Sequence, residues 1–337
     1  MSKALSLPPQ DTKPDGSPRR VGVEIEFAGL DCRRVADMLA HRFGGGVEVI
    51  DPYRHIVETE SRGRFVVELD TQFVHPDEAE TPAKRAELER ERLAEALGAG
   101  LRTAVGEITR LYLPVEIGCP PVPIAALPEL DSIIADLRAA GAEGTRESLA
   151  YAFGLQLNID PPALDAATVL AYLRAYLVAS PWLRGDIEVD LTRRVLPFVQ
   201  PFPKAYLRRV LDPDYAPDLG GLIADYLRDN PTRNRELDML PLFAWLDPAT
   251  VRRAVDDPRL KPRPALHYRL PDSRLDLPDW GIVQEWNRWA ESVEALAADP
   301  AWLARASAAY LDHLNRDPLG EWALGDWAEA AVNWLRR

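Results

Sequence analysis

The stretch that most constrains the fold is residues 21–27, which read VGVEIEF. Successive side chains of a β-strand point to opposite faces, so its alternate apolar residues would enter a core while Glu24 and Glu26 stand together on the other surface. The pattern therefore predicts a strand that directs two carboxylates at one place. Taken alone, it is also typical of a half-buried strand whose polar face is solvated.

Four later stretches repeat the alternation, each with an apolar side and a side that carries oxygen or nitrogen ligands. They are residues 64–70, 111–118, 153–160 and 265–270. Their polar sides carry Glu68, Asp70, Glu116, Gln156, Asn158, His267 and Arg269. In one curved antiparallel sheet, the acids among them would converge on the concave surface, where repulsion between carboxylates requires compensating cations. Mg²⁺, which prefers oxygen ligands, is the natural partner, and separate solvated strand faces are the alternative.

Composition limits the classes of protein that fit this pattern. The chain has 337 residues and 47% hydrophobic content, enough for one enzyme-sized unit with helical additions. Lys+Arg number 40 against 53 Asp+Glu, and the resulting charge of -13 argues against general nucleic-acid binding. Two cysteines are too few for a disulfide framework, and no apolar run approaches the roughly 20 residues of a membrane span. We therefore expect a cytoplasmic protein that does not enter membranes, and the composition leaves its oligomeric state open.

Helix signals lie between and after the strands, which predicts an α+β fold. Asp31 would cap a helix over residues 32–43, and three glycines would end it. Further strands are expected near residues 47–50, 55–60 and 64–73, and further helices at 81–97, 129–140, 166–178, 219–228, 235–245 and 249–255. We expect a disordered lead over residues 1–18, a catalytic domain over 19–275, and a helical Trp-rich extension over 276–337 packed on the same domain.

Arginines accompany the predicted polar face. Arg269 lies on its last strand, and Arg233 and Arg235 stand at an expected helix start. Guanidinium groups in such positions bind phosphate or a substrate carboxylate. Ion pairs with Glu236 or Asp238 explain Arg233 and Arg235 equally well.

Four segments, taken in order, resemble the motifs of the amidoligase family. They are GVEIEF at residues 22–27, VELD at 67–70, VEIGCPP at 115–121 and GLQLNID at 154–160. The family belongs to the carboxylate–amine ligase superfamily, together with glutamine synthetase and glutamate–cysteine ligase. The resemblance covers about residues 21–270, and the Trp-rich end adds no catalytic signature.

The resemblance implies a curved antiparallel sheet that binds ATP and two or three Mg²⁺ ions, with Mn²⁺ as a substitute. Such enzymes phosphorylate a substrate carboxylate, and an amine then displaces phosphate to leave an amide. The implied catalytic residues are Glu26, Glu116 and Arg269, and the implied nucleotide-binding residues are Gln156, Asn158, Arg233 and Arg235. One metal would lie between Glu26, Glu116 and either Asp70 or Glu68; a second would lie between Glu24, His267 and either Gln156 or Asn158.

Two departures from the family pattern bear on the second metal. Relatives often carry histidine where Gln156 stands, and the last strand commonly reads Glu-x-Arg where this chain has His267-Tyr268-Arg269. The leading hypothesis is an amide-forming ligase acting on a small-molecule or peptide carboxylate and an amine. A metal-dependent phosphotransferase or hydrolase with the same acids, and a noncatalytic binding protein that retains the fold, are the alternatives.

Overall fold

A nine-stranded antiparallel sheet forms the centre of the molecule. The structure, a computed structural model, describes residues 4–69, 114–145, 153–187, 199–316 and 327–331. The strands follow the order β2-β3-β4-β5-β1-β7-β9-β8, and β6 pairs with β1 beside this path. Their bounds are β1 Arg20–Phe27, β2 Gly45–Asp51, β3 Arg54–Thr59, β4 Gly63–Leu69, β5 Val115–Gly118, β6 Val122–Pro123, β7 Leu155–Ile159, β8 Leu237–Asp238 and β9 Leu266–Tyr268.

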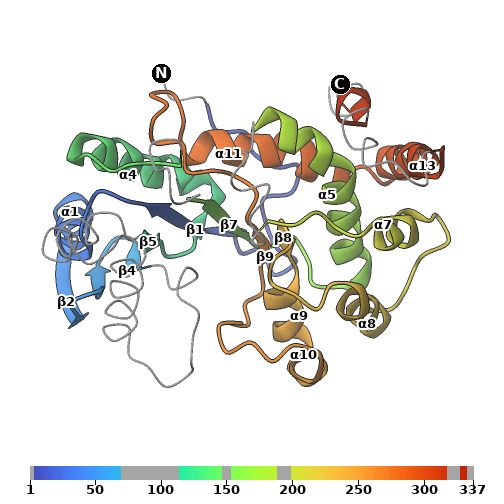
Figure 1. Cartoon of the computed structure of the whole chain (residues 1–337), viewed down its shortest axis with the longest axis horizontal. Helices are drawn as coiled ribbons and strands as arrows, with labels where there is room; N and C mark the ends of the chain where they lie inside the picture. The colour runs from blue at the N-terminus through green and yellow to red at the C-terminus, as the bar shows by residue number, and fades with distance from the viewer. Residues whose placement is uncertain (1–3, 70–113, 146–152, 188–198, 317–326, 332–337) are drawn as a thin grey trace, which may run out of the picture.

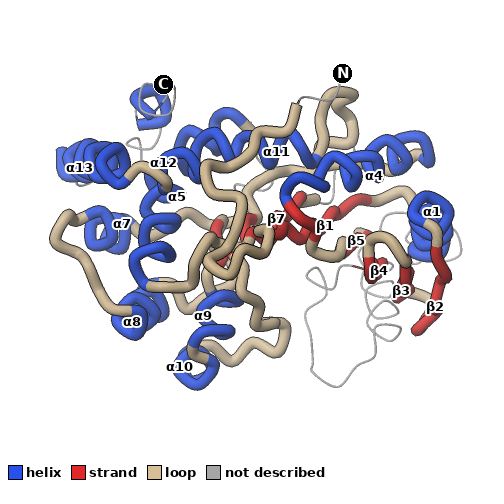
Figure 2. Tube along the Cα trace, turned by 180° about the vertical axis from the view of Figure 1, so that it is seen from behind, coloured by secondary structure: helices blue, strands red, loops and turns tan. Residues whose placement is uncertain are grey.

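Helices surround this sheet, which confirms the α+β class. In Figure 1, α4 and α11 lie along one side of the sheet, and α9 and α10 lie on the other side, below β8 and β9. Figure 2 shows the same arrangement from behind, with α1 beside β2. The helices are α1 Cys32–Phe43, α4 Leu127–Ala140, α5 Ala166–Asp186, α7 Lys204–Leu211, α8 Leu219–Asp229, α9 Leu240–Leu246, α10 Pro248–Ala254, α11 Ile282–Trp289, α12 Ala295–Ala297 and α13 Pro300–Arg316. A 3-10 turn, Ile124–Ala126, precedes α4, and a π-helical turn, Ala290–Glu294, follows α11.

The alternation of β1 has the consequence predicted from its sequence. Val23, Ile25 and Phe27 are completely buried, and the apolar sides of β4, β5, β7 and β9 join them in one core cluster. β1 lies between β5 and β7, so this strand is hydrogen-bonded along both edges. The same cluster extends to Trp327 and Ala331. The sheet and the Trp-rich end thus share one interior.

Several predicted elements differ from the observed ones. The helix expected over residues 235–245 is wrong at its start, because Leu237–Asp238 is strand β8, and α9 begins only at Leu240. Helix α5 continues to Asp186, with Pro181 inside it, and α7 was not predicted. Val122–Pro123, in a proline-rich stretch, adds a short strand that pairs with the first two residues of β1. The helix expected at 81–97 and the strand residues expected at 111–113 lie outside the described residues.

The predicted disorder of the N-terminal lead is wrong for residues 4–18. The amide of Asn287 on α11 donates to the carbonyl of Ala4 at 2.8 Å, and its oxygen accepts from the backbone N–H of Ser6 at 2.8 Å. The indole of Trp286 donates to the carbonyl of Ser6 at 2.8 Å. The polar composition of the lead concealed these contacts because they form through its backbone.

The Trp-rich end packs as expected from its indoles. Trp280, Trp286, Trp289, Trp302 and Trp327 are all buried. Within the described part of the chain, no helix is both long and apolar enough to cross a membrane.

Candidate functional site

The register of the sheet aligns three predicted carboxylates. Glu26 on β1 pairs with Glu116 on β5, and Glu116 pairs with Glu68 on β4. Directly paired residues of antiparallel strands project from the same face of the sheet. These three residues form what we call the acid row. On the outer side of the row, Arg54 Nε lies 3.3 Å from Glu68 Oε2.

The same face continues across β7, β9 and β8. Glu24 pairs with Gln156, and Asn158 pairs with His267, which in turn pairs with Asp238. Gln156 is 2% exposed and His267 is 3% exposed. The alternative of separate, solvated strand faces is therefore wrong for this part of the sheet.

Glu26 is fixed by two donors from the neighbouring strand. Its Oε1 accepts from the Gln156 amide at 2.6 Å, and its Oε2 accepts from the backbone N–H of Gly154 at 2.7 Å. Glu26 is 5% exposed. A buried carboxylate held at both oxygens has a defined orientation, which is what binding a metal or a substrate requires.

The orientation of Gln156 also determines the tautomer of His267. Because a carboxylate accepts hydrogen bonds, the Gln156 nitrogen faces Glu26, and its oxygen faces His267 Nε2 at 2.6 Å. His267 Nε2 must therefore carry a proton and donate it to Gln156 Oε1. The other ring nitrogen, Nδ1, is buried and has no hydrogen-bond partner. His267 thus positions Gln156, and its Nε2 lone pair is not available to a metal in this arrangement.

Glu24 lies among three polar partners. Its Oε1 accepts from Asn158 Nδ2 at 2.9 Å and from Arg263 Nη1 at 2.8 Å, and His267 Nε2 lies 3.6 Å from its Oε2. Burial alone would raise the pKa of Glu24, but His267 and Arg263 outweigh burial and hold this pKa well below its usual range. Burial lowers the pKa of His267 to about 4 despite the nearby carboxylate. At neutral pH, Glu24 is therefore charged and His267 is neutral.

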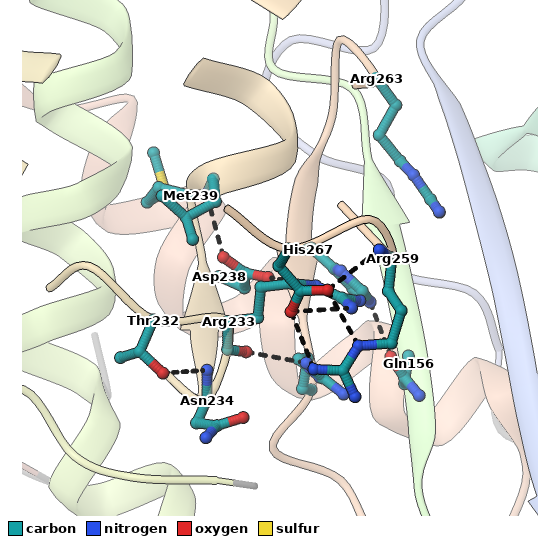
Figure 3. Close-up of polar contacts among 12 residues, drawn as sticks. Gln156, Thr232, Arg233, Asn234, Asp238, Met239, Arg259, Arg263 and His267 are labelled. Atoms are coloured by element: carbon teal, nitrogen blue, oxygen red, sulfur yellow. Dashed lines mark hydrogen bonds and ion pairs between the residues drawn. The ribbon is translucent and has the colours of Figure 1, made fainter. Parts of the chain in front are cut away.

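A group of arginines and aspartates adjoins these residues at the β8–β9 end of the sheet. Arg233 Nη1 lies 3.8 Å from Asp257 Oδ2 and its Nε lies 4.0 Å from Asp238 Oδ2. Arg259 Nη2 donates to Asp257 at 2.8 Å, and Arg269 Nη1 donates to the carbonyl of Arg233 at 2.8 Å. Figure 3 shows Arg233, Arg259 and Asp238 gathered beside His267 and Gln156. We call these five residues, Arg233, Arg259, Arg269, Asp238 and Asp257, the arginine–aspartate group.

The charges in this group do not cancel. Three guanidinium groups face two carboxylates, and burial raises the pKa of Asp238 to about 6 in spite of Arg269 and Arg233. Asp238 is completely buried, and its Oδ2 has no hydrogen-bond partner. Burial and the neighbouring Arg269 lower the pKa of Arg233. This end of the face carries a surplus of positive charge, which suits an anionic ligand.

Of the residues predicted for the site, Arg235 lies elsewhere and Asp70 lies outside the described residues. Arg235 Nη1 donates to the carbonyl of Pro201 at 2.5 Å, and the guanidinium lies 5.8 Å from the centre of the Phe202 ring. The structure thus places Arg235 in a packing contact beside a bridge to Gln200, away from the arginine–aspartate group. Of the two ion pairs left open from the sequence, the one between Arg233 and Asp238 is present. Asp70 lies outside the described residues.

Comparison with protein families matches the chain to one family. The model of the family described as "putative amidoligase enzyme" matches residues 17–291. The chain is an amidoligase family member. The match begins just before β1 and ends beyond α11, so it includes the acid row, Glu24 and the arginine–aspartate group. No curated protein and no solved structure matched the chain.

The residues of the site differ in how well they suit metal ions. The acid row offers hard oxygen donors on adjacent strands, a donor set that fits Mg²⁺ in kind. As placed among the described residues, no three His, Cys, Asp or Glu side chains are grouped closely enough to hold an ion. At Glu24 the residues do not fit a second ion, because Arg263 contacts the carboxylate and His267 uses Nε2 toward Gln156.

The sequence did not identify Arg263, Asp238, Arg259 or Asp257 as residues of the candidate site. Three of them lie on irregular chain and Asp238 lies in a two-residue strand, where alternation over several residues gives no signal. One available signal was Pro262-Arg263-Pro264, because prolines on both sides restrict the backbone of the arginine between them.

Proposed function

We propose that this amidoligase is an ATP- and Mg²⁺-dependent carboxylate–amine ligase. Its substrates would be a carboxylate on a small molecule or peptide and an amine, with Mn²⁺ able to replace Mg²⁺. One observation carries the proposal: a single face of one sheet bears carboxylates at β4, β5 and β1 and a positive surplus at β9 and β8. A phosphate-bearing substrate with its cation needs both kinds of charge within one site.

The nucleotide would supply a γ-phosphoryl group that converts the substrate carboxylate into an acyl phosphate, from which an amine displaces phosphate. The role of the arginine–aspartate group is to bind and orient anionic oxygens. Arg233 and Arg269 are fixed for this role, because the guanidinium of Arg269 is bonded to the backbone carbonyl of Arg233. Prepositioned guanidinium groups stabilise developing negative charge without reorganising during the reaction.

The acid row would hold the cation of the nucleotide. Glu26 has the most defined orientation because it is held by Gln156 and Gly154, while Glu116 stands between Glu26 and Glu68. These three residues, with Asp70 where the chain continues beyond Leu69, are the ligands we propose. Gln156 and Asn158 position the carboxylates of Glu26 and Glu24 from β7.

The test is trapping of an activated acyl group. The purified protein is incubated with Mg·ATP, a panel of amino acids and dicarboxylic acids, and hydroxylamine, and both ADP and hydroxamate are measured. We expect ADP and hydroxamate to appear together for at least one acid. Glu116→Gln and Arg269→Gln should each lower hydroxamate formation on the order of 100-fold. Arg253→Gln is the matched control, because Arg253 is exposed and donates to Thr250 of its own helix.

The alternative functions give different results in the same assay. A metal-dependent phosphotransferase or hydrolase would form ADP without hydroxamate. A noncatalytic protein would form neither product and would show no calorimetric response to Mg·ATP. Either result would overturn the ligase proposal.

A further inference from the structure

The surroundings of Glu24 resemble a cation-binding site in which the Arg263 guanidinium is the cation. Arg263 Nη1 lies 2.8 Å from Glu24 Oε1 and 2.9 Å from Asn158 Oδ1. One guanidinium nitrogen therefore lies between a carboxylate oxygen and an amide oxygen. These are two of the donors that the family resemblance assigns to a second metal.

The remaining donor predicted for that metal is engaged in another contact. His267 Nε2 donates to Gln156 Oε1 at 2.6 Å, so its proton occupies the position through which it would bind an ion. Glu24 already has Asn158 and Arg263 as hydrogen-bond donors at one oxygen. The charge of Glu24 is thus compensated without any bound ion.

The chain also fixes the position of Arg263. The residue lies between Pro262 and Pro264, which restrict its backbone. Its N–H donates to the carbonyl of Pro241 at 3.0 Å, and its carbonyl accepts from Ala265 at 2.8 Å. In Figure 3, Arg263 stands apart from Arg233, Arg259 and Asp238. Among the described residues, the hydrogen bonds of the Arg263 guanidinium therefore go to Glu24 and Asn158, not to the arginine–aspartate group.

We propose that Arg263 is a built-in cation that takes the place of one metal ion at Glu24. This inference rests on the proposed function only in that metal-dependent relatives would place an ion there. A guanidinium stays protonated throughout the physiological pH range and does not dissociate from the chain. Glu24 is then no metal ligand in this protein. The chain binds one divalent ion fewer than it would if Arg263 did not contact the Glu24 carboxylate.

The experiment counts bound Mn²⁺ by electron paramagnetic resonance of the free ion in equilibrium titrations of the full chain. We expect Arg263→Gln to bind one more Mn²⁺ per chain than the wild type. The substitution removes the guanidinium from Glu24 Oε1 and Asn158 Oδ1 and adds an amide oxygen. The extra ion should be lost in the Glu24→Gln, Arg263→Gln double variant. Glu24→Gln alone should leave the wild-type number unchanged.

Two further variants separate charge from folding. Arg263→Lys keeps a cation at this position and should bind the wild-type number of Mn²⁺ ions. Arg253→Gln removes one positive charge from an exposed helix position and should also leave the number unchanged. Thermal unfolding of each variant identifies any that does not fold. If Arg263→Gln does not fold, the Mn²⁺ numbers of Arg263→Lys and Glu24→Gln test the inference, because both should equal the wild-type number.

Two results would overturn the inference: an unchanged Mn²⁺ number in folded Arg263→Gln, or the loss of an ion from the wild type on Glu24→Gln. Failure of the ligase proposal is read separately, because hydroxamate formation is measured on the wild type and does not depend on ion counting. An Mn²⁺ site gained in Arg263→Gln without hydroxamate in the wild type would leave this inference standing and remove the proposed function.

Discussion

At the scale of single residues, the site is held together by hydrogen bonds in which each polar group can act only as donor or only as acceptor. The Gln156 amide donates to Glu26 and accepts from His267, so it connects β1 and β9 through β7. If any one of these groups changed from donor to acceptor, its buried neighbour would lose its partner. Such a network specifies one arrangement of side chains more strongly than apolar packing does.

The first prediction concerns Glu26→Gln. The introduced amide nitrogen would face either the Gln156 amide or the Gly154 N–H, both of which are donors. Because this region is buried, we expect the free energy of unfolding to fall by about 1–3 kcal/mol, measured by urea denaturation. Glu48→Gln, at an exposed position on β2, should leave the urea midpoint nearly unchanged. An equal effect of both substitutions would contradict the role of the network.

The second prediction concerns the pH dependence of stability through Asp238. Its pKa is raised from 3.8 to about 6 in the folded protein, so the folded state binds the proton more tightly than the unfolded state. The stabilising contribution of that proton is complete below the unfolded pKa and is lost as pH rises through the folded pKa. Asp238→Asn cannot titrate, so wild type should lose about 1 kcal/mol relative to this variant between pH 5 and pH 7.5. Urea denaturation at the two pH values measures this difference, and a change of opposite sign would contradict the burial of an ionisable carboxyl there.

At the scale of elements, the sequence predicted what depends on neighbours along the chain. The alternation of residues 21–27 predicted β1, and Asp31 with the following glycines predicted both ends of α1. Prediction from the sequence failed where a contact between residues distant along the chain determines the structure. Leu237–Asp238 is a strand only because β9 pairs with it, and the helical composition around it favoured a helix. The acid row was predictable because its residues alternate in strands, whereas Arg263 lies on a loop whose course depends on Pro241.

The third prediction tests the cap of α1. The Asp31 side chain accepts from the backbone N–H of Arg34 at 2.8 Å, which satisfies a donor at the start of the helix. Asp31→Ala should lower the free energy of unfolding by about 1 kcal/mol, measured by thermal or urea denaturation. Asp37→Ala on the same helix breaks only an exposed pair with Arg33 and should change stability much less. The reverse order of effects would show that the cap contributes little.

At the scale of the whole molecule, one buried carboxylate connects the N-terminal segment, α5 and the π-helical turn after α11. Glu294 accepts from Arg19 Nη2 at 2.6 Å, from the Tyr172 hydroxyl at 2.5 Å and from the Trp289 indole at 3.0 Å. Arg19 is fully buried and Glu294 is 1% exposed. The family match starts at residue 17, so this contact attaches the first matched residues to the Trp-rich end.

The fourth prediction follows from that contact. Glu294→Gln would leave the Arg19 guanidinium buried without a countercharge, and we expect the free energy of unfolding to fall by about 3–5 kcal/mol. Calorimetry or urea denaturation measures the loss. Glu291→Gln, an exposed neighbour that accepts from the Ser6 hydroxyl at 2.7 Å, is the control and should have a much smaller effect. Similar losses in both variants would contradict a special role for the buried pair.

The central position of β1 has a consequence for how the protein is made. The strand ends at Phe27, so it leaves the ribosome before the strands that cover its edges, which begin at Val115, Val122 and Leu155. Until those segments emerge, the nascent chain presents an unpaired apolar strand to other chains. Translation rate and chaperone supply should therefore govern the yield of folded protein from a host cell more than the stability of the finished molecule does.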